Sequence, residues 1–171
     1  MRRRGTAAAA VAVAVFTTTA GCGLVGDSES ATAPASSPDP VVPYTRETAA
    51  GEITSLALAG GLPAGDMAMS GLPKGGWRNC VAPWTTEAPA AGAADAFEAT
   101  VMRLRQHDWE IVSSHAEKDI TYRTLAKRGW KIYARYYAME GFGPDRIVSL
   151  TAVEDGCALP GRIRGDYEDP A

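Results

Sequence analysis

Histidine and cysteine, on which most metal sites and many enzyme active sites depend, are scarce in this sequence. Its 171 residues include two histidines and three cysteines. It contains no Gly-x-Ser-x-Gly elbow, phosphate-binding loop, His-Glu-x-x-His motif or Cys-x-x-Cys pair. We therefore predict no catalytic residues, no bound metal and no cofactor, and we expect His107 to end a helix.

An excess of positive charge is also missing. The chain has 17 basic residues against 20 acidic ones, a net charge of -3. A protein that binds nucleic acid through its phosphates needs a concentrated basic surface, so we predict no nucleic-acid partner. Apolar runs are short as well: residues 7–16 form a run of ten, whereas a membrane-spanning helix needs about 20.

The first 21 residues have the layout of a secretory signal peptide. Arg2, Arg3 and Arg4 precede the apolar run, and small residues follow it. Removing this leader leaves 14 basic against 20 acidic residues. Neighbouring arginines also occur in twin-arginine signals, so the general secretory and the twin-arginine routes both stay open.

The end of the leader carries a short motif around the first cysteine. Thr19-Ala20-Gly21-Cys22 resembles the lipobox of bacterial lipoproteins, with Thr19 in place of the usual aliphatic residue. This resemblance implies that Cys22 is lipidated and that the lipid anchors the chain to the cell membrane, on its extracytoplasmic face. The alternative is ordinary cleavage after Ala20, which would leave Cys22 as a spare thiol.

Residues 22–48 are expected to form a disordered tether that begins with the lipidated cysteine. Ser, Ala, Asp and Pro dominate this segment, and proline opposes helix formation. The segment has too little apolar surface to fold alone. As a flexible coil of about 20 residues it would span roughly 25 Å, which is the role of a spacer.

Residues 49–160 are expected to form one small α+β domain, followed by a loose tail at residues 161–171. A short helix is predicted over residues 47–58 and a short strand over residues 77–82, closed by Pro83. The main amphipathic helix is predicted over residues 89–106, because apolar residues recur three and four apart, at Ala90, Ala94, Phe97, Val101 and Leu104.

An antiparallel meander of three or four strands should follow, with the main helix on one of its faces. A three-residue loop, Lys127-Arg128-Gly129, is predicted between two of its strands, because that register separates their apolar and polar faces. Ala126 would then lie opposite Trp130. The outer face would carry aromatic and basic side chains, namely Arg123, Lys131, Tyr133, Arg135 and Tyr137.

This outer face is the candidate ligand-binding surface. Aromatic rings flanked by cations suit an anionic cell-wall polymer or a protein partner. The alternative is a solvated sheet face without a ligand, because Tyr and Arg are common strand residues.

The lipobox, the tether and two cysteines that bracket a small domain resemble the small secreted lipoproteins of high-GC Gram-positive bacteria. The resemblance implies a location and an architecture but no activity. With Cys22 assigned to lipid, Cys80 and Cys157 are left to form a disulfide in the oxidising exterior. We predict a membrane-anchored, non-catalytic binding module; the alternatives are a small cell-envelope enzyme and a structural or assembly component of the envelope.

Overall fold

The computed structural model describes residues 43–70, 74–139 and 144–167. The predicted signal peptide, Cys22 and residues 22–42 of the predicted tether lie outside the described residues. Along the chain, the elements are α1 (Arg46–Ala59), the 3-10 helix η1 (Gly76–Cys80), β1 (Val81–Pro89), α2 (Ala90–Gln106), β2 (Glu110–Glu117), β3 (Ile120–Lys127), β4 (Trp130–Tyr137), β5 (Asp145–Glu154), α3 (Gly161–Arg164) and the 3-10 helix η2 (Gly165–Tyr167).

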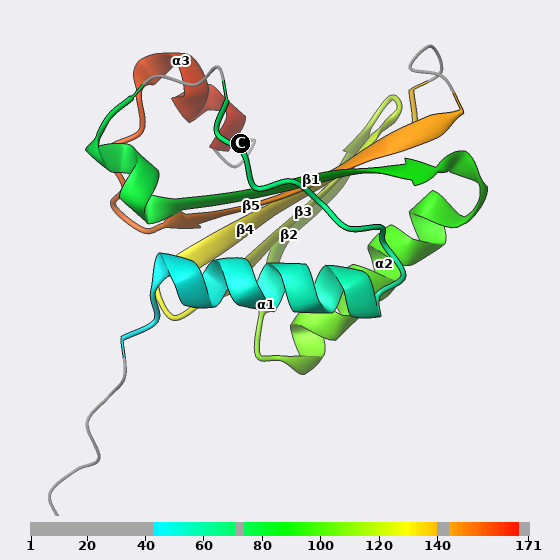
Figure 1. The fold of residues 1–171 in the computed structure, drawn as a ribbon, viewed down its shortest axis with the longest axis horizontal. Helices are drawn as coiled ribbons and strands as arrows, with labels where there is room; N and C mark the ends of the chain where they lie inside the picture. Colours follow the sequence, from blue (N-terminus) through cyan, green and yellow to red (C-terminus); the bar gives the residue numbers. More distant parts are fainter. Residues whose placement is uncertain (1–42, 71–73, 140–143, 168–171) are drawn as a thin grey trace, which may run out of the picture. The chain divides into compact units, whose positions relative to one another are not determined.

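The five strands form one antiparallel sheet in the order β1-β5-β4-β3-β2. Strands β2 to β5 are neighbours in sequence order, whereas β1 pairs with β5 at the far edge. Helices α1 and α2 lie against one side of the sheet, here called the inner face (Figure 1). The fold class is therefore α+β, as predicted. The main core lies between helices and sheet and includes Ile53, Trp84, Phe97, Leu104, Ile132 and Leu150.

Both long helices lie close to their predicted bounds. The Thr45 side chain accepts a hydrogen bond from a backbone N–H in the first turn of α1, and the helix ends at Gly60. Helix α2 is interrupted near its start, where Gly92 has a φ of 92°. The prediction that Ala90 and Ala94 face the core is wrong, since both are exposed. The buried stripe of α2 consists of Ala93, Phe97, Thr100, Val101 and Leu104.

The first strand differs from its prediction at both ends. Residues 76–80 form η1 and not a strand, and β1 continues through Pro83 to Pro89. Proline lacks the N–H that a central strand needs, but an edge strand tolerates it. Because β1 is the edge strand, Pro83 pairs with Thr151 on one side without breaking the sheet.

The loop between β3 and β4 has two residues, not the predicted three. Arg128 and Gly129 have φ angles of 49° and 77°, as in the type I′ turns that join antiparallel strands. Lys127 therefore pairs with Trp130. A shift of one residue moves every side chain of a strand to the opposite face, so β3 is inverted relative to its prediction. Leu125, predicted on the outer face, lies fully buried in the main core.

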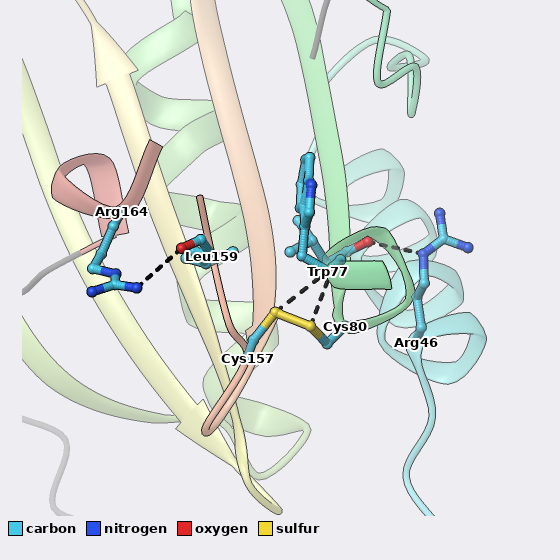
Figure 2. Close-up of a disulfide and its surroundings, with 7 residues drawn as sticks. Arg46, Trp77, Cys80, Cys157, Leu159 and Arg164 are labelled. Atoms are coloured by element: carbon cyan, nitrogen blue, oxygen red, sulfur yellow. Dashed lines mark hydrogen bonds between the residues drawn. A yellow bond between two sulfur atoms is a disulfide. The ribbon is translucent and has the colours of Figure 1, made fainter. Parts of the chain in front are cut away.

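A second, smaller core lies on the outer face of the sheet, at the end where β1 begins and β5 ends. The predicted disulfide borders it and is confirmed: the Cα atoms of Cys80 and Cys157 are 5.9 Å apart. The two sulfur atoms lie 3.1 and 3.7 Å from the carbonyl oxygen of Trp77 (Figure 2). The buried members of this second core are Trp77, Val81, Val153, Leu159 and Ile163.

The C-terminal segment belongs to the folded domain as far as Tyr167. The prediction of a loose tail is wrong for residues 161–167, because α3 and η2 pack on the second core and Ile163 is 8% exposed. Residues 168–171 lie outside the described residues. This packing brings Tyr167 onto the outer face of the sheet, beside Tyr133.

Candidate functional site

The predicted ligand-binding face is divided between the two sides of the sheet. Because residues alternate along a strand, Lys131, Tyr133, Arg135 and Tyr137 share the outer face of β4. Arg123 does not join them. The two-residue loop places it on the inner face, where its guanidinium forms an ion pair with Glu98 of α2 at 2.7 Å. The prediction that the Arg123 side chain projects from the outer face is therefore wrong, although Arg123 is among the residues that line the hollow described below.

The residue that takes the place of Arg123 on the outer face is Tyr122. In the sheet, His115 lies directly opposite Tyr122, and Tyr122 lies directly opposite Arg135. Directly opposed residues are the closest side-chain neighbours in an antiparallel sheet. The ring of His115 stacks on the ring of Tyr122, with centroids 4.3 Å apart and planes 8° apart. The guanidinium carbon of Arg135 lies 5.8 Å from the Tyr122 centroid.

The C-terminal segment extends this row. Tyr167 of η2 also contacts Arg135, with its ring centroid 5.5 Å from the guanidinium carbon. Its ring also meets Tyr133 edge-on, with centroids 5.3 Å apart. The result is a continuous row of four rings and one cation, which we call the aromatic row: His115, Tyr122, Arg135, Tyr167 and Tyr133.

A hollow of about 310 Å³ lies along the aromatic row. This volume is at the lower end of the range of small-molecule sites, about 300 to 1,000 Å³. All members of the row except Tyr167 line it, together with two carboxylates, one further tyrosine and Arg123. Its lining includes His115, Glu117, Tyr122, Arg135, Tyr137 and Asp166.

Sequence reasoning missed three members of the aromatic row: His115, Tyr122 and Tyr167. Tyr122 was missed because the β3–β4 loop was predicted one residue too long, which placed this side chain on the inner face. Leu125 indicated the correct register, because the predicted register leaves this aliphatic residue on the outer face. Tyr167 was lost because the tail was predicted to be loose. The signal there was a helical spacing, since Leu159, Ile163 and Tyr167 lie four residues apart.

A second cluster of ionisable groups lies on the inner face, around the carboxylate of Glu52 in α1. This carboxylate accepts hydrogen bonds from the Tyr44 hydroxyl at 2.7 Å, from Trp109 Nε1 at 2.9 Å and from Lys127 Nζ at 2.8 and 3.0 Å. Burial alone would raise the pKa of Glu52, but these hydrogen bonds outweigh it and hold the pKa below its ordinary value. Burial and the adjacent Glu52 raise the pKa of the Tyr44 phenol, which therefore stays a donor.

The Glu52 cluster has the features of a structural network. Lys127 also donates to the carbonyl oxygen of His107, 2.8 Å away, and lies above the rings of Tyr44 and Trp109. Every polar group named here has a partner within the domain, and the lysine side chain is 9% exposed. The cluster ties the start of the domain to the β3–β4 hairpin and to the end of α2.

The residues that the structure describes contain no group of three or more His, Cys, Asp and Glu side chains placed to hold a metal ion, and no helix long and apolar enough to cross a membrane. His107 caps the C-terminal end of α2, as predicted, and Cys80 is held in the disulfide. Comparisons with protein-family models, curated proteins and solved structures find no match to this chain.

Proposed function

We propose that this chain is a membrane-anchored extracytoplasmic lipoprotein whose domain is a non-catalytic binding module, with the aromatic row as its contact surface. The observation that carries this proposal is the hollow beside the row, which is bordered by ring faces and by a cation. Ring faces and cations are the groups that bind carbohydrates, anions and protein partners. An anionic cell-wall polymer or a protein partner fits this surface.

The sequence before residue 43 supports the location of the module. The leader, Cys22 and the Pro-rich tether together suit a domain held outside the cell at a short distance from its membrane. A spacer of this kind is useful to a module that must reach a partner beyond the membrane surface. The small envelope enzyme and the structural component of the envelope remain the competing functions.

Substitution of the lipobox cysteine tests the anchor. Cys22→Ala is expected to abolish incorporation of a radioactive fatty acid and to release the chain into the medium or leave its leader uncleaved, because no other thiol is free to carry the lipid. The measurement is metabolic labelling of cells that express the full chain, followed by membrane fractionation. A wild-type chain that stays unlabelled would contradict lipid anchoring.

Loss of one ring from the aromatic row tests the contact surface. Tyr122→Ala removes the ring that lies between His115 and Arg135, so we expect binding to insoluble cell-wall material to fall by about tenfold. The measurement is co-sedimentation of the detergent-solubilised full chain with walls of the producing cells. Arg103→Ala, at an exposed position of α2, is the matched control and should bind as the wild type does.

Three outcomes of this experiment separate the candidate functions. Equal co-sedimentation of the two variants would contradict the aromatic row as the contact surface for the wall. Soluble fragments released from the wall by the wild type, detected by mass spectrometry, would favour the enzyme. Absence of wall binding, together with one envelope protein that cross-links to the wild type and not to Tyr122→Ala, would identify the partner as a protein.

A further inference from the structure

The guanidinium of Arg135 lies over the rings of two tyrosines. Its guanidinium carbon lies 5.8 Å from the centroid of Tyr122 and 5.5 Å from that of Tyr167. A guanidinium is planar: its faces pack on rings, and its N–H donors point outward along its edge. Contact with the two rings restricts where the cation lies, and a ring face accepts none of its ordinary N–H···O hydrogen bonds.

That edge has no acceptor among the residues that the structure describes. Arg123 on the neighbouring strand has Glu98 as its partner, and Lys127 at the end of that strand has Glu52. Arg135 makes ring contacts, but within the described ranges it has neither an ion pair nor a hydrogen bond to a carboxylate or a carbonyl. Arg135 is half-buried and lines the hollow, so these donors are placed beside that space.

The surroundings of Arg135 restrict what these donors would bind. A planar fork of N–H groups matches the two oxygens of a carboxylate or a phosphate. Glu117 and Asp166 also line the hollow, so a ligand that carries many negative charges would be repelled, whereas their oxygens would accept hydrogen bonds from hydroxyl groups. Tyr137 borders the same space with no ring partner among the described residues, which leaves its face to pack on a flat ring of the ligand.

Resting on the proposed function, we infer that Arg135 is the oxyanion-binding residue of this module. Its ligand is a hydroxylated ring, such as one sugar unit, that carries a single carboxylate or phosphate group. The oxyanion pairs with the edge of Arg135, the ring packs on Tyr137, and the hydroxyl groups donate to Glu117 and Asp166. Tyr122 and Tyr167 act as positioning residues, because the guanidinium lies over both of their rings.

The test titrates the detergent-solubilised full chain with four probes by isothermal titration calorimetry: glucuronate, glucose 1-phosphate, glucose and inorganic phosphate. Glucuronate or glucose 1-phosphate is expected to bind at least about tenfold more tightly than glucose, and whichever binds better identifies the oxyanion. Inorganic phosphate should bind more weakly than glucose 1-phosphate, because it has no ring. Equal affinities for glucuronate, glucose 1-phosphate and glucose would overturn the inference.

Two arginine variants provide the matched pair for this titration. Arg135→Gln should weaken binding of the charged sugars by about tenfold or more and leave the weak binding of glucose unchanged. Arg103→Gln removes the same type of charge from an exposed position of α2 that does not line the hollow, so it should leave all affinities unchanged. Arg135→Lys keeps the charge but not the planar fork, so it should bind the charged sugars more weakly than the wild type and more tightly than Arg135→Gln. Wild-type affinity in Arg135→Gln would refute the role of Arg135.

The same variants separate failure of this inference from failure of the proposed function. If Tyr122→Ala loses wall binding and Arg135→Gln keeps it, the aromatic row is the contact surface but the oxyanion inference is wrong. Glu168 and Asp169, which follow Tyr167 and lie outside the described residues, are tested as Glu168→Gln with Asp169→Asn. If the double variant binds charged sugars and the wild type does not, Arg135 pairs with Glu168 or Asp169 of its own chain. That result would overturn the inference that Arg135 binds an external ligand.

Discussion

Replacement of both Cys80 and Cys157 by alanine is expected to lower the free energy of unfolding by about 4.5 kcal/mol. The disulfide joins residues separated by 77 positions, and closing a loop of that length removes about this much chain entropy from the unfolded state. Domains of this size are stable by about 5 to 15 kcal/mol, so the loss would consume a large part of the margin. Alanine suits both positions because they border the apolar second core.

Chemical denaturation of the full chain measures this effect, with the reduced wild type as the control. Reduction and double substitution should give the same midpoint, since each removes only the cross-link. The second core should loosen first, because the bond fastens η1 to the segment that leads into α3 (Figure 2). A double variant within about 1 kcal/mol of the oxidised wild type would show that packing around Trp77 holds these segments together without the bond.

The disulfide also shows which long-range features the sequence was able to predict. Its prediction needed no knowledge of the fold, because assigning Cys22 to lipid left one pair of cysteines. Most of the core face of α2 was similarly accessible, because Phe97, Val101 and Leu104 repeat with helical spacing. These predictions depend on local periodicity and residue counts, which a single sequence records directly.

The errors arose at two kinds of position: a turn whose length could differ by one residue, and a strand whose extent depends on which strand it pairs with. Either a two-residue or a three-residue turn could be read around Gly129, and only packing against the helices selects the register that buries Leu125. A proline such as Pro83 would end a central strand but is tolerated in an edge strand. Strand β1 is an edge strand because it pairs only with β5 within the sheet, which a single sequence does not reveal. Tyr167 lies at the candidate site because Ile163, four residues earlier, packs in the second core and holds the C-terminal segment against the sheet. The sequence analysis did not predict this second core.

The aromatic row therefore combines predictable and unpredictable parts. Tyr133, Arg135 and Tyr137 were placed correctly together, since they alternate along one strand whatever its neighbours do. The partners that give Arg135 its geometry, Tyr122 and Tyr167, come from tertiary structure. The same error in loop length placed Arg123 on the outer face and Tyr122 on the inner face. The residues that β4 contributes to the outer face were therefore predicted correctly, whereas those from β3 were not.

Glu52→Gln is expected to lower the free energy of unfolding by about 3 kcal/mol near neutral pH. The amide keeps the shape of the carboxylate but leaves Lys127, whose side chain is 9% exposed, without its counter-charge. It also places an N–H₂ group among donors from Tyr44, Trp109 and Lys127, so at least one buried donor loses its acceptor. The estimate is at the lower end of the range for buried pairs because the Glu52 side chain is 27% exposed.

The pH dependence of this effect gives a second test, with its sign fixed by the lowered pKa of Glu52. A carboxyl whose pKa is lower in the folded state contributes its full stabilisation above its unfolded pKa of about 4.3, and this is lost as the pH falls through the folded value. The difference between wild type and Glu52→Gln should therefore shrink as the pH falls below about 5. Chemical denaturation across this range measures the difference.

Glu98→Gln, which breaks the more exposed pair with Arg123, is the matched control and should lower the free energy of unfolding by no more than about 1 kcal/mol. Equal costs for the two variants at neutral pH would contradict a special role for the Glu52 cluster.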